Sequence, residues 1–282
     1  YAGQVLRVKG SDLRPKRQFG QIGAELIGSL SPQADAEVVL MAAEALTDLG
    51  VPNLSVDLGL PTLVTAICSA REIDLSAEGS NLRASLNQKD APAIEALSEK
   101  LGDETSALFG TLLKAVGPAD KALAILQKCP LPENAKAELA NLAAVIECLK
   151  DRAPNLTLTI DPVETRGYEY HTGVTFTFFA LDVRGEIGRG GRYLAEDTNG
   201  GDSEETATGV SLFIDTILRA LPDPTQPDRV YVPASTPGVA QKLRQEDWIV
   251  VESFDDGDME QAKLAGCSHY WDGSQVTPVT NS

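Results

Sequence analysis

The chain has 282 residues, 43% of them hydrophobic and 23% charged, a balance typical of a globular protein with one large domain and at most a small appendage. It carries 24 Lys and Arg residues against 41 Asp and Glu residues, so its formal charge of −17 repels polyanions such as nucleic acids. No apolar run of about 18 residues and no basic start followed by an apolar stretch occurs, so we expect neither a membrane-spanning helix nor a secretory signal.

Residues 1–28 are predicted to form two strands joined by a basic turn. Because Tyr1 lies inside the first strand, we expect a further N-terminal segment before this numbering. In the second strand Gln21, Gly23 and Glu25 share one face, since side chains alternate along a strand. Gln21 and Glu25 together offer hydrogen-bond partners for an ammonium or imidazole group. This pair alone, however, favours a polar strand face exposed to solvent.

The next part of the chain is predicted to be mainly helical. Ser31 and Pro32 are typical of a helix start, and Gly50 of a helix end. Residues 54–59 alternate apolar and polar side chains like a half-buried strand. Residues 61–150 then have a helical pattern, which predicts an insertion between two parts of a sheet. Its predicted breaks are Gly79, Gly102, Gly117 with Pro118, and residues 130–132.

A group of functional side chains lies between two further predicted strands, residues 156–160 and 174–181. Residues 164–173 contain an arginine, two tyrosines, a histidine and two glycines. Arg166 can bind a carboxylate or phosphate through two hydrogen bonds, and Tyr170 and His171 can hold a small planar ligand. The alternative is a plain connection with a packed tyrosine and a surface histidine. The density of functional types favours a site.

The last third of the chain contains a glycine motif, a linker and a small terminal piece. Residues 188–192 do not match a phosphate-binding loop, and their alternative role is a tight turn close to a ligand. Residues 208–221 have the character of a strand followed by a helix. Three prolines in residues 222–227 predict a linker. Strands at residues 230–232 and 248–251 and a helix at residues 239–245 follow.

Cysteine and histidine patterns indicate no metal site. None of the cysteines has C-x-x-C spacing, so we expect buried free thiols in a reducing cytoplasm; they are Cys68, Cys129, Cys148 and Cys267. The two histidines have no metal-ligand spacing, and we expect neither a metal nor a cofactor. His269 is interpreted as a packed or surface residue, because no nucleophile accompanies it.

Taken in order, these segments resemble the class II catalytic core of the histidyl-tRNA synthetase family. Residues 1–7 with residues 17–25 resemble the second class II motif. Residues 166–173 resemble the histidine-specific R-G-L-D-Y-Y-T-G loop. Residues 190–193 and 209–217 resemble the following strand and the third motif. The resemblance covers residues 1 to about 221 and implies an α+β fold with an antiparallel sheet, flanking helices and a helical insertion.

Departures from the family pattern affect the nucleotide side of the site. Lys9 stands where active synthetases have a glutamate, and Thr216 replaces the ATP-binding arginine of the third motif. Threonine supplies neither the charge nor the fork of donors of a guanidinium. Phe213 replaces a glycine next to the nucleotide, and His171 replaces the second tyrosine of the histidine loop. The short tail is also too small for a complete anticodon-binding domain.

The resemblance therefore implies a synthetase paralogue, the regulatory subunit family of ATP phosphoribosyltransferase, and no enzyme. That family implies a cytoplasmic hetero-oligomer, a dimer of this chain with a short-form catalytic subunit, and feedback by histidine at the first step of histidine biosynthesis. It implies no nucleic-acid or membrane partner. The implied histidine-binding residues are Arg7, Gln21, Glu25, Arg166, Gly167, Tyr170, His171, Thr172 and Gly173.

Two enzyme alternatives remain, an active histidyl-tRNA synthetase core and a synthetase-like protein that modifies another substrate. In every case the predicted domains are a synthetase-like core, residues 1–221, and a small C-terminal α/β domain, residues 228–282. The helical insertion of the core is placed at about residues 61–150.

Overall fold

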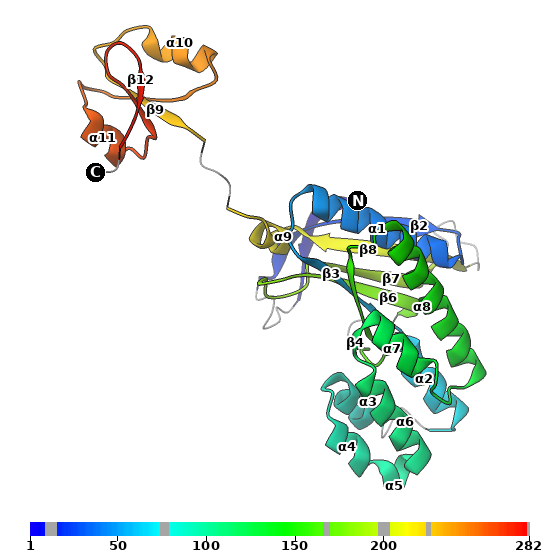
Figure 1. The fold of residues 1–282 in the computed structure, drawn as a ribbon. Helices are drawn as coiled ribbons and strands as arrows, with labels where there is room; N and C mark the ends of the chain where they lie inside the picture. Colours follow the sequence, from blue (N-terminus) through cyan, green and yellow to red (C-terminus); the bar gives the residue numbers. More distant parts are fainter. Residues whose placement is uncertain (9–15, 74–78, 166–169, 197–203, 224–226, 281–282) are drawn as a thin grey trace. The chain divides into compact units, whose positions relative to one another are not determined.

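The computed structural model describes residues 1–8, 16–73, 79–165, 170–196, 204–223 and 227–280, which form two compact units, Tyr1–Pro222 and Asp223–Ser282. Within these residues, the first unit contains an eight-stranded sheet in the order β1-β2-β8-β7-β6-β3-β5-β4 (Figure 1). The strands are β1 (Ala2–Leu6), β2 (Gln18–Ile27), β3 (Leu54–Gly59), β4 (Gly117–Pro118), β5 (Thr157–Asp161), β6 (His171–Ala180), β7 (Gly188–Glu196) and β8 (Glu204–Phe213).

The predicted antiparallel pairing holds for all neighbouring strands of this sheet except β3 and β5, which are parallel. Parallel neighbours need a long crossover connection, because the chain must return to the same end of the sheet. The helical insertion between β3 and β5 provides this crossover.

One face of the sheet is covered by two long helices, α1 (Pro32–Asp48) and α8 (Glu133–Arg152), which pack against each other (Figure 1). The predicted start of α1 is confirmed, since Ser31 is its N-cap and its side chain accepts a hydrogen bond from the backbone N–H of Gln33. Ile22, Ala24 and Leu26 of β2 pack into the hydrophobic core. The alternation of β2 therefore turns Gln21 and Glu25 to the opposite face.

The insertion is helical, as predicted, with the two-residue strand β4 as an exception. Its helices α3 to α6 gather at one end of the core unit (Figure 1). Gly79 begins a helix, and Gly102, Gly117 with Pro118, and residues 130–132 separate helices, so the predicted breaks all fall at helix boundaries. The helices are α2 (Pro61–Ala70), α3 (Gly79–Asn87), α4 (Ala91–Ala96), α5 (Ser98–Leu101), α6 (Asp103–Lys114) and α7 (Ala119–Leu126).

The prediction of a tight turn at residues 188–192 is wrong, because these residues begin strand β7. A Cβ atom at Gly188 would lie 2.7 Å from the backbone oxygen of Ser211 on β8, and one at Gly190 would lie 2.7 Å from the Phe176 ring of β6. These glycines therefore serve close packing between neighbouring strands and not a change of chain direction.

Arg192 of β7 forms a buried anchor between the sheet and α1. Its Nη2 lies 2.9 Å from Oδ1 of Asp35, and both side chains are almost completely buried. Arg192 also donates hydrogen bonds to the backbone oxygens of Ser29 (2.6 Å) and Ser31 (3.2 Å). Thr208 of β8 donates to Asp35 as well. This network satisfies both buried charges with hydrogen bonds.

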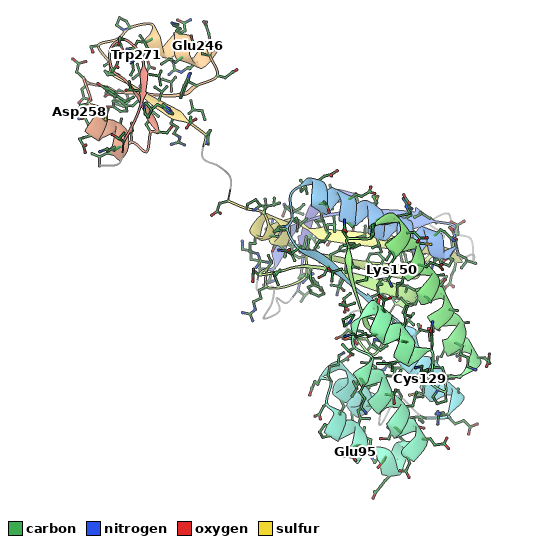
Figure 2. All side chains as sticks on the ribbon, viewed as in Figure 1. Glu95, Cys129, Lys150, Glu246, Asp258 and Trp271 are labelled. Carbon is green, nitrogen blue, oxygen red and sulfur yellow. The ribbon has the colours of Figure 1, made fainter. Side chains whose placement is uncertain are left out.

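The second unit has a four-stranded sheet in the order β10-β9-β11-β12. The predicted segments are confirmed as β9 (Arg229–Val232), α10 (Val239–Gln245) and β10 (Ile249–Glu252). Three further elements were not predicted, namely α11 (Met259–Leu264), β11 (His269–Trp271) and β12 (Val276–Pro278). Asp258, labelled with Trp271 in Figure 2, caps α11 by accepting hydrogen bonds from the N–H groups of Glu260 and Gln261.

The cysteines are free thiols, and Cys68, Cys129 (labelled in Figure 2) and Cys267 are buried as expected, whereas Cys148 is only half-buried. Burial raises the pKa of the Cys68 thiol to about 11. No helix in the described ranges has both the length and the apolar character needed to cross a bilayer.

Candidate functional site

A cavity of about 330 Å³ lies on the sheet face that carries Gln21 and Glu25. Two glycines lie side by side on its floor. Gly209 of β8 pairs with Gly191 of β7 on one side and with Glu25 of β2 on the other. A Cβ atom at Gly209 would overlap the Glu25 carboxyl group, and one at Gly191 would lie 2.7 Å from the His171 ring. The cavity therefore depends on these two glycines.

The wall formed by β2 and β8 is a network of polar side chains. The Gln21 amide donates hydrogen bonds to the Tyr1 hydroxyl (2.8 Å) and to the Ser211 hydroxyl (3.0 Å), and these two hydroxyls lie 2.6 Å apart. Tyr193 of β7 donates to Oε2 of Glu25 at 3.0 Å. This network fixes the Gln21 amide and the Glu25 carboxylate in place before a ligand arrives.

Opposite charges face this cavity. Burial raises the pKa of the Glu25 carboxyl, although the hydrogen bond from Tyr193 opposes the shift. Burial and the neighbouring Glu25 raise the pKa of Tyr193 to about 12, so its hydroxyl remains a donor at neutral pH. The Arg7 guanidinium lies over the Phe19 ring, 4.6 Å from its centroid, and 5.7 Å from the Phe213 centroid. These rings hold the cation through cation–π contacts.

An aromatic group closes the side of the cavity formed by β6 and β7. The Tyr170 and His171 rings are 4.0 Å apart at an interplanar angle of 37°, and Tyr170 meets Tyr193 edge-on at 5.9 Å. His171 is buried, whereas Tyr170 is 65% exposed. The arrangement suits a small, flat, polar ligand, with an anionic acceptor at Glu25, a cation at Arg7 and an aromatic face between them.

The structure brings together five of the nine residues predicted to bind histidine, since this cavity is lined by Arg7, Gln21, Glu25, Tyr170 and His171. Thr172 and Gly173 do not line it. Thr172 is exposed, and Gly173 packs against the side chain of Arg192. Arg166 and Gly167 lie outside the described residues, as does Lys9.

Sequence reasoning missed several lining residues, among them Arg189, Tyr193 and Ser211. Arg189 lies within the glycine motif of β7 and Tyr193 directly follows it. Both are an even number of residues from Gly191, so strand alternation places them on the same face as Gly191. The signal was present in the sequence. The resemblance placed residues 190–193 in a strand, and the alternation includes Arg189 only once residues 188 and 189 are assigned to the same strand.

The two third-motif residues that depart from the family pattern, Thr216 and Phe213, present no polar group to the cavity. Thr216 is fully buried in α9 (Ile214–Ala220) and accepts a hydrogen bond from Arg219 at 3.1 Å. Phe213 is 2% exposed and packs edge-to-face against Phe19, with ring centroids 5.9 Å apart. His269, in the second unit, packs against Trp248, as the interpretation of a packed or surface residue requires.

Known structures have the same fold. A protein of Bacillus halodurans described as an ATP phosphoribosyltransferase regulatory subunit/histidyl-tRNA synthetase matches with a TM-score of 0.71, at 22% identity, covering 96% of this chain and 70% of its own. A histidyl-tRNA synthetase from Nostoc matches with a TM-score of 0.67, at 20% identity, covering 90% and 66%. A chain of an ATP phosphoribosyl transferase complex from Thermotoga maritima matches with a TM-score of 0.61, at 20% identity, covering 76% and 72%. The predicted class II synthetase-like fold is confirmed.

Sequence relatives identify the family. The family model for histidyl-tRNA synthetase matches residues 1–217. An ATP phosphoribosyltransferase regulatory subunit of Paramagnetospirillum magneticum is 50% identical over 272 residues, which cover 95% of this chain and 69% of the relative. One from Rhodospirillum centenum is 45% identical over 282 residues, covering 99% and 70%. The chain therefore belongs to the ATP phosphoribosyltransferase regulatory subunits, a family with the histidyl-tRNA synthetase fold.

Proposed function

We propose that this chain binds histidine in the cavity between Arg7 and Glu25 and thereby controls a short-form ATP phosphoribosyltransferase catalytic subunit at the first step of histidine biosynthesis. The observation that carries the proposal is the pairing of a held cation at Arg7 with the Glu25 carboxylate, whose pKa is raised, across one small polar cavity. Family membership supplies the partner, because the relatives are named as regulatory subunits of this enzyme.

Histidine has three groups that this cavity can recognise. Its carboxylate is complementary to Arg7, whose guanidinium has fixed N–H donors. Its ammonium or imidazole N–H groups are complementary to the Glu25 carboxylate and to the side-chain oxygen of Gln21, which accepts hydrogen bonds. Its flat ring suits the aromatic group of Tyr170 and His171. Arg166 and Gly167, which lie outside the described residues, remain predicted contacts, whereas Thr172 and Gly173 do not line this cavity.

The nucleotide side supports binding without adenylate formation. Thr216 is enclosed in α9 and offers no charge to a phosphate group, and the Phe213 ring fills space beside Arg7. Loss of a cationic donor to a reacting phosphate lowers rates by orders of magnitude. An ATP–pyrophosphate exchange assay with histidine is therefore expected to be silent. Exchange at a rate typical of a synthetase would favour the active-synthetase alternative.

Control of the partner needs different histidine affinities in two states of the complex. Such a coupling is typically worth ~1–3 kcal/mol, which changes affinity by roughly 5- to 150-fold. We infer that the chain acts in the cytoplasm as a dimer within a hetero-oligomer, without a cofactor. By reciprocity, if histidine shifts the complex to a less active state, the partner in that state must tighten histidine binding.

Calorimetric titration with histidine, on the chain alone and with its catalytic subunit, tests this function. We expect binding in at least one of these two forms, weakened in Glu25→Gln and unchanged in Glu133→Gln, an exposed carboxylate at the start of α8. We also expect a short phosphoribosyltransferase to co-purify with the chain. Absence of histidine binding in both forms would refute histidine sensing, and absence of the partner would refute the assembly.

A further inference from the structure

A second cavity, of about 640 Å³, lies between the sheet and the helical insertion. Its volume lies within the range of ~300–1,000 Å³ that is usual for small-molecule sites. Among the described residues that line it, only Pro61 and Ala66 are apolar. The polar lining residues are Thr62, Thr65, Ser69, Arg83, Asn87, Asn134, Glu138, Thr165 and His171. Such a lining suits a small ligand with charges and hydrogen-bonding groups rather than an apolar one.

Two opposite charges line this cavity from different helices. Arg83 comes from α3, and within the described ranges its Nε is buried without a hydrogen-bond partner. Its Nη2 donates a long hydrogen bond, 3.4 Å, to the Thr65 hydroxyl. Glu138 comes from α8, and its carboxyl accepts a hydrogen bond from Thr62. Burial raises the pKa of Glu138. Among the residues that the structure describes, neither charge has an ion-pair partner.

We propose that this cavity is a second small-molecule site, distinct from the one between Arg7 and Glu25, that binds a zwitterionic ligand of the α-amino-acid class. A partly buried charge is costly unless an opposite charge compensates it. A ligand carboxylate at Arg83 and a ligand ammonium at Glu138 compensate both charges at once. The amides of Asn87 and Asn134 add donors and acceptors for further polar groups of the ligand.

The second cavity adjoins the proposed histidine-binding cavity. His171 lines both cavities, so an occupant of the second would contact a wall of the first. Asn87 also accepts a hydrogen bond from the backbone N–H of Thr165 at 3.0 Å. Thr165 directly precedes the predicted histidine loop, residues 166–173, and His171 belongs to it. An effect of the second ligand on histidine affinity rests on the proposed function, whereas binding of a ligand in the second cavity does not.

Binding can be tested by titrating the chain with each of the twenty standard amino acids, in a Glu25→Gln background that weakens binding in the first cavity. We expect at least one amino acid to bind, with affinity reduced roughly 10-fold or more by Arg83→Gln and by Glu138→Gln. Glu133→Gln, an exposed carboxylate on the same helix as Glu138, should leave binding unchanged. Arg83→Lys and Glu138→Asp, which keep the charges, should retain part of the affinity.

Three results would overturn the proposal. The first is that no amino acid binds. The second is that an amino acid binds but neither Arg83→Gln nor Glu138→Gln weakens its binding. The third is that sulfate binds as tightly as the amino acid and that Glu138→Gln does not change the affinity for either. Thermal melting of each variant shows whether it is folded. If a glutamine variant does not fold, Arg83→Lys or Glu138→Asp replaces it in the binding measurement. A separate measurement tests the proposed function. If the parent chain and Glu25→Gln bind histidine with the same affinity, the proposed function fails, whatever the result for the second cavity.

Discussion

Substitution of Gly209 by alanine tests whether the Glu25 carboxylate contacts histidine, without changing Glu25 itself. A Cβ atom at this position would overlap the carboxyl group, so Glu25 must move away from its place beside Tyr193. The obstacle is the flexible end of one side chain, since the three atoms nearest to the new methyl group all belong to the Glu25 carboxyl group. We therefore expect folding to cost about 1 kcal/mol or less, at the low end of overpacking effects.

The expected effect on histidine binding is larger. A hydrogen bond to a charged group contributes ~1.5–3 kcal/mol, so loss of the carboxylate from the cavity should weaken histidine binding roughly 10- to 150-fold. Calorimetric titration of the parent and Gly209→Ala proteins measures this ratio, and urea denaturation measures the stability change. Gly3→Ala in β1 is the matched control, because a Cβ atom there meets no atom within 4 Å. It should change neither quantity appreciably.

If a folded Gly209→Ala protein bound histidine as tightly as the parent protein, the reasoning would be refuted, since the carboxylate cannot keep its place beside an added Cβ. Loss of both folding and affinity would show instead that the paired glycines are needed for the sheet itself.

Three further predictions concern stability, pH and reactivity. Arg192→Met should lower the free energy of unfolding by ~3–5 kcal/mol in urea titrations, because Asp35 is left buried and unpaired, and Arg192→Met with Asp35→Leu should recover most of this loss. Because the pKa of Glu25 is raised in the folded protein, its carboxyl group holds a proton more tightly there than in the unfolded chain. Between the ordinary glutamate value of about 4.3 and the raised value, its contribution to stability therefore falls as pH rises, and Glu25→Gln should remove this slope in urea titrations at stepped pH. Histidine affinity should fall as pH drops below that raised pKa, as calorimetry at the same steps would record. The Cys68 thiol, with a pKa of about 11, should react with thiol reagents at neutral pH only after unfolding.

The parts of the site that sequence could predict are those governed by local periodicity. Strand alternation alone placed Gln21 and Glu25 on one face, and both line the cavity. Their partners could not be predicted in this way, because Ser211 and Tyr193 come from strands more than 160 residues away along the chain. Whether a polar strand face meets solvent or a ligand depends on which strands lie beside it.

Glycine and buried charge explain most of what was mispredicted. Glycine is common in turns, so residues 188–192 indicated a change of direction, whereas in β7 the missing side chains make room for neighbouring strands. The pairing of Arg192 with Asp35 joins residues 157 positions apart. Neither residue type nor spacing distinguishes these two from the many solvent-exposed charges of this acidic chain.

The Arg192 anchor also has a consequence for how β7 aligns with its neighbours. A strand rich in glycine has few side chains to fix its alignment, and a shift by one residue exchanges its two faces. Such a shift would turn Arg192 toward the cavity and take Arg189 and Tyr193 away from it, while Asp35 would lose its buried partner. The ion pair on the helix side therefore determines which residues of β7 face the cavity.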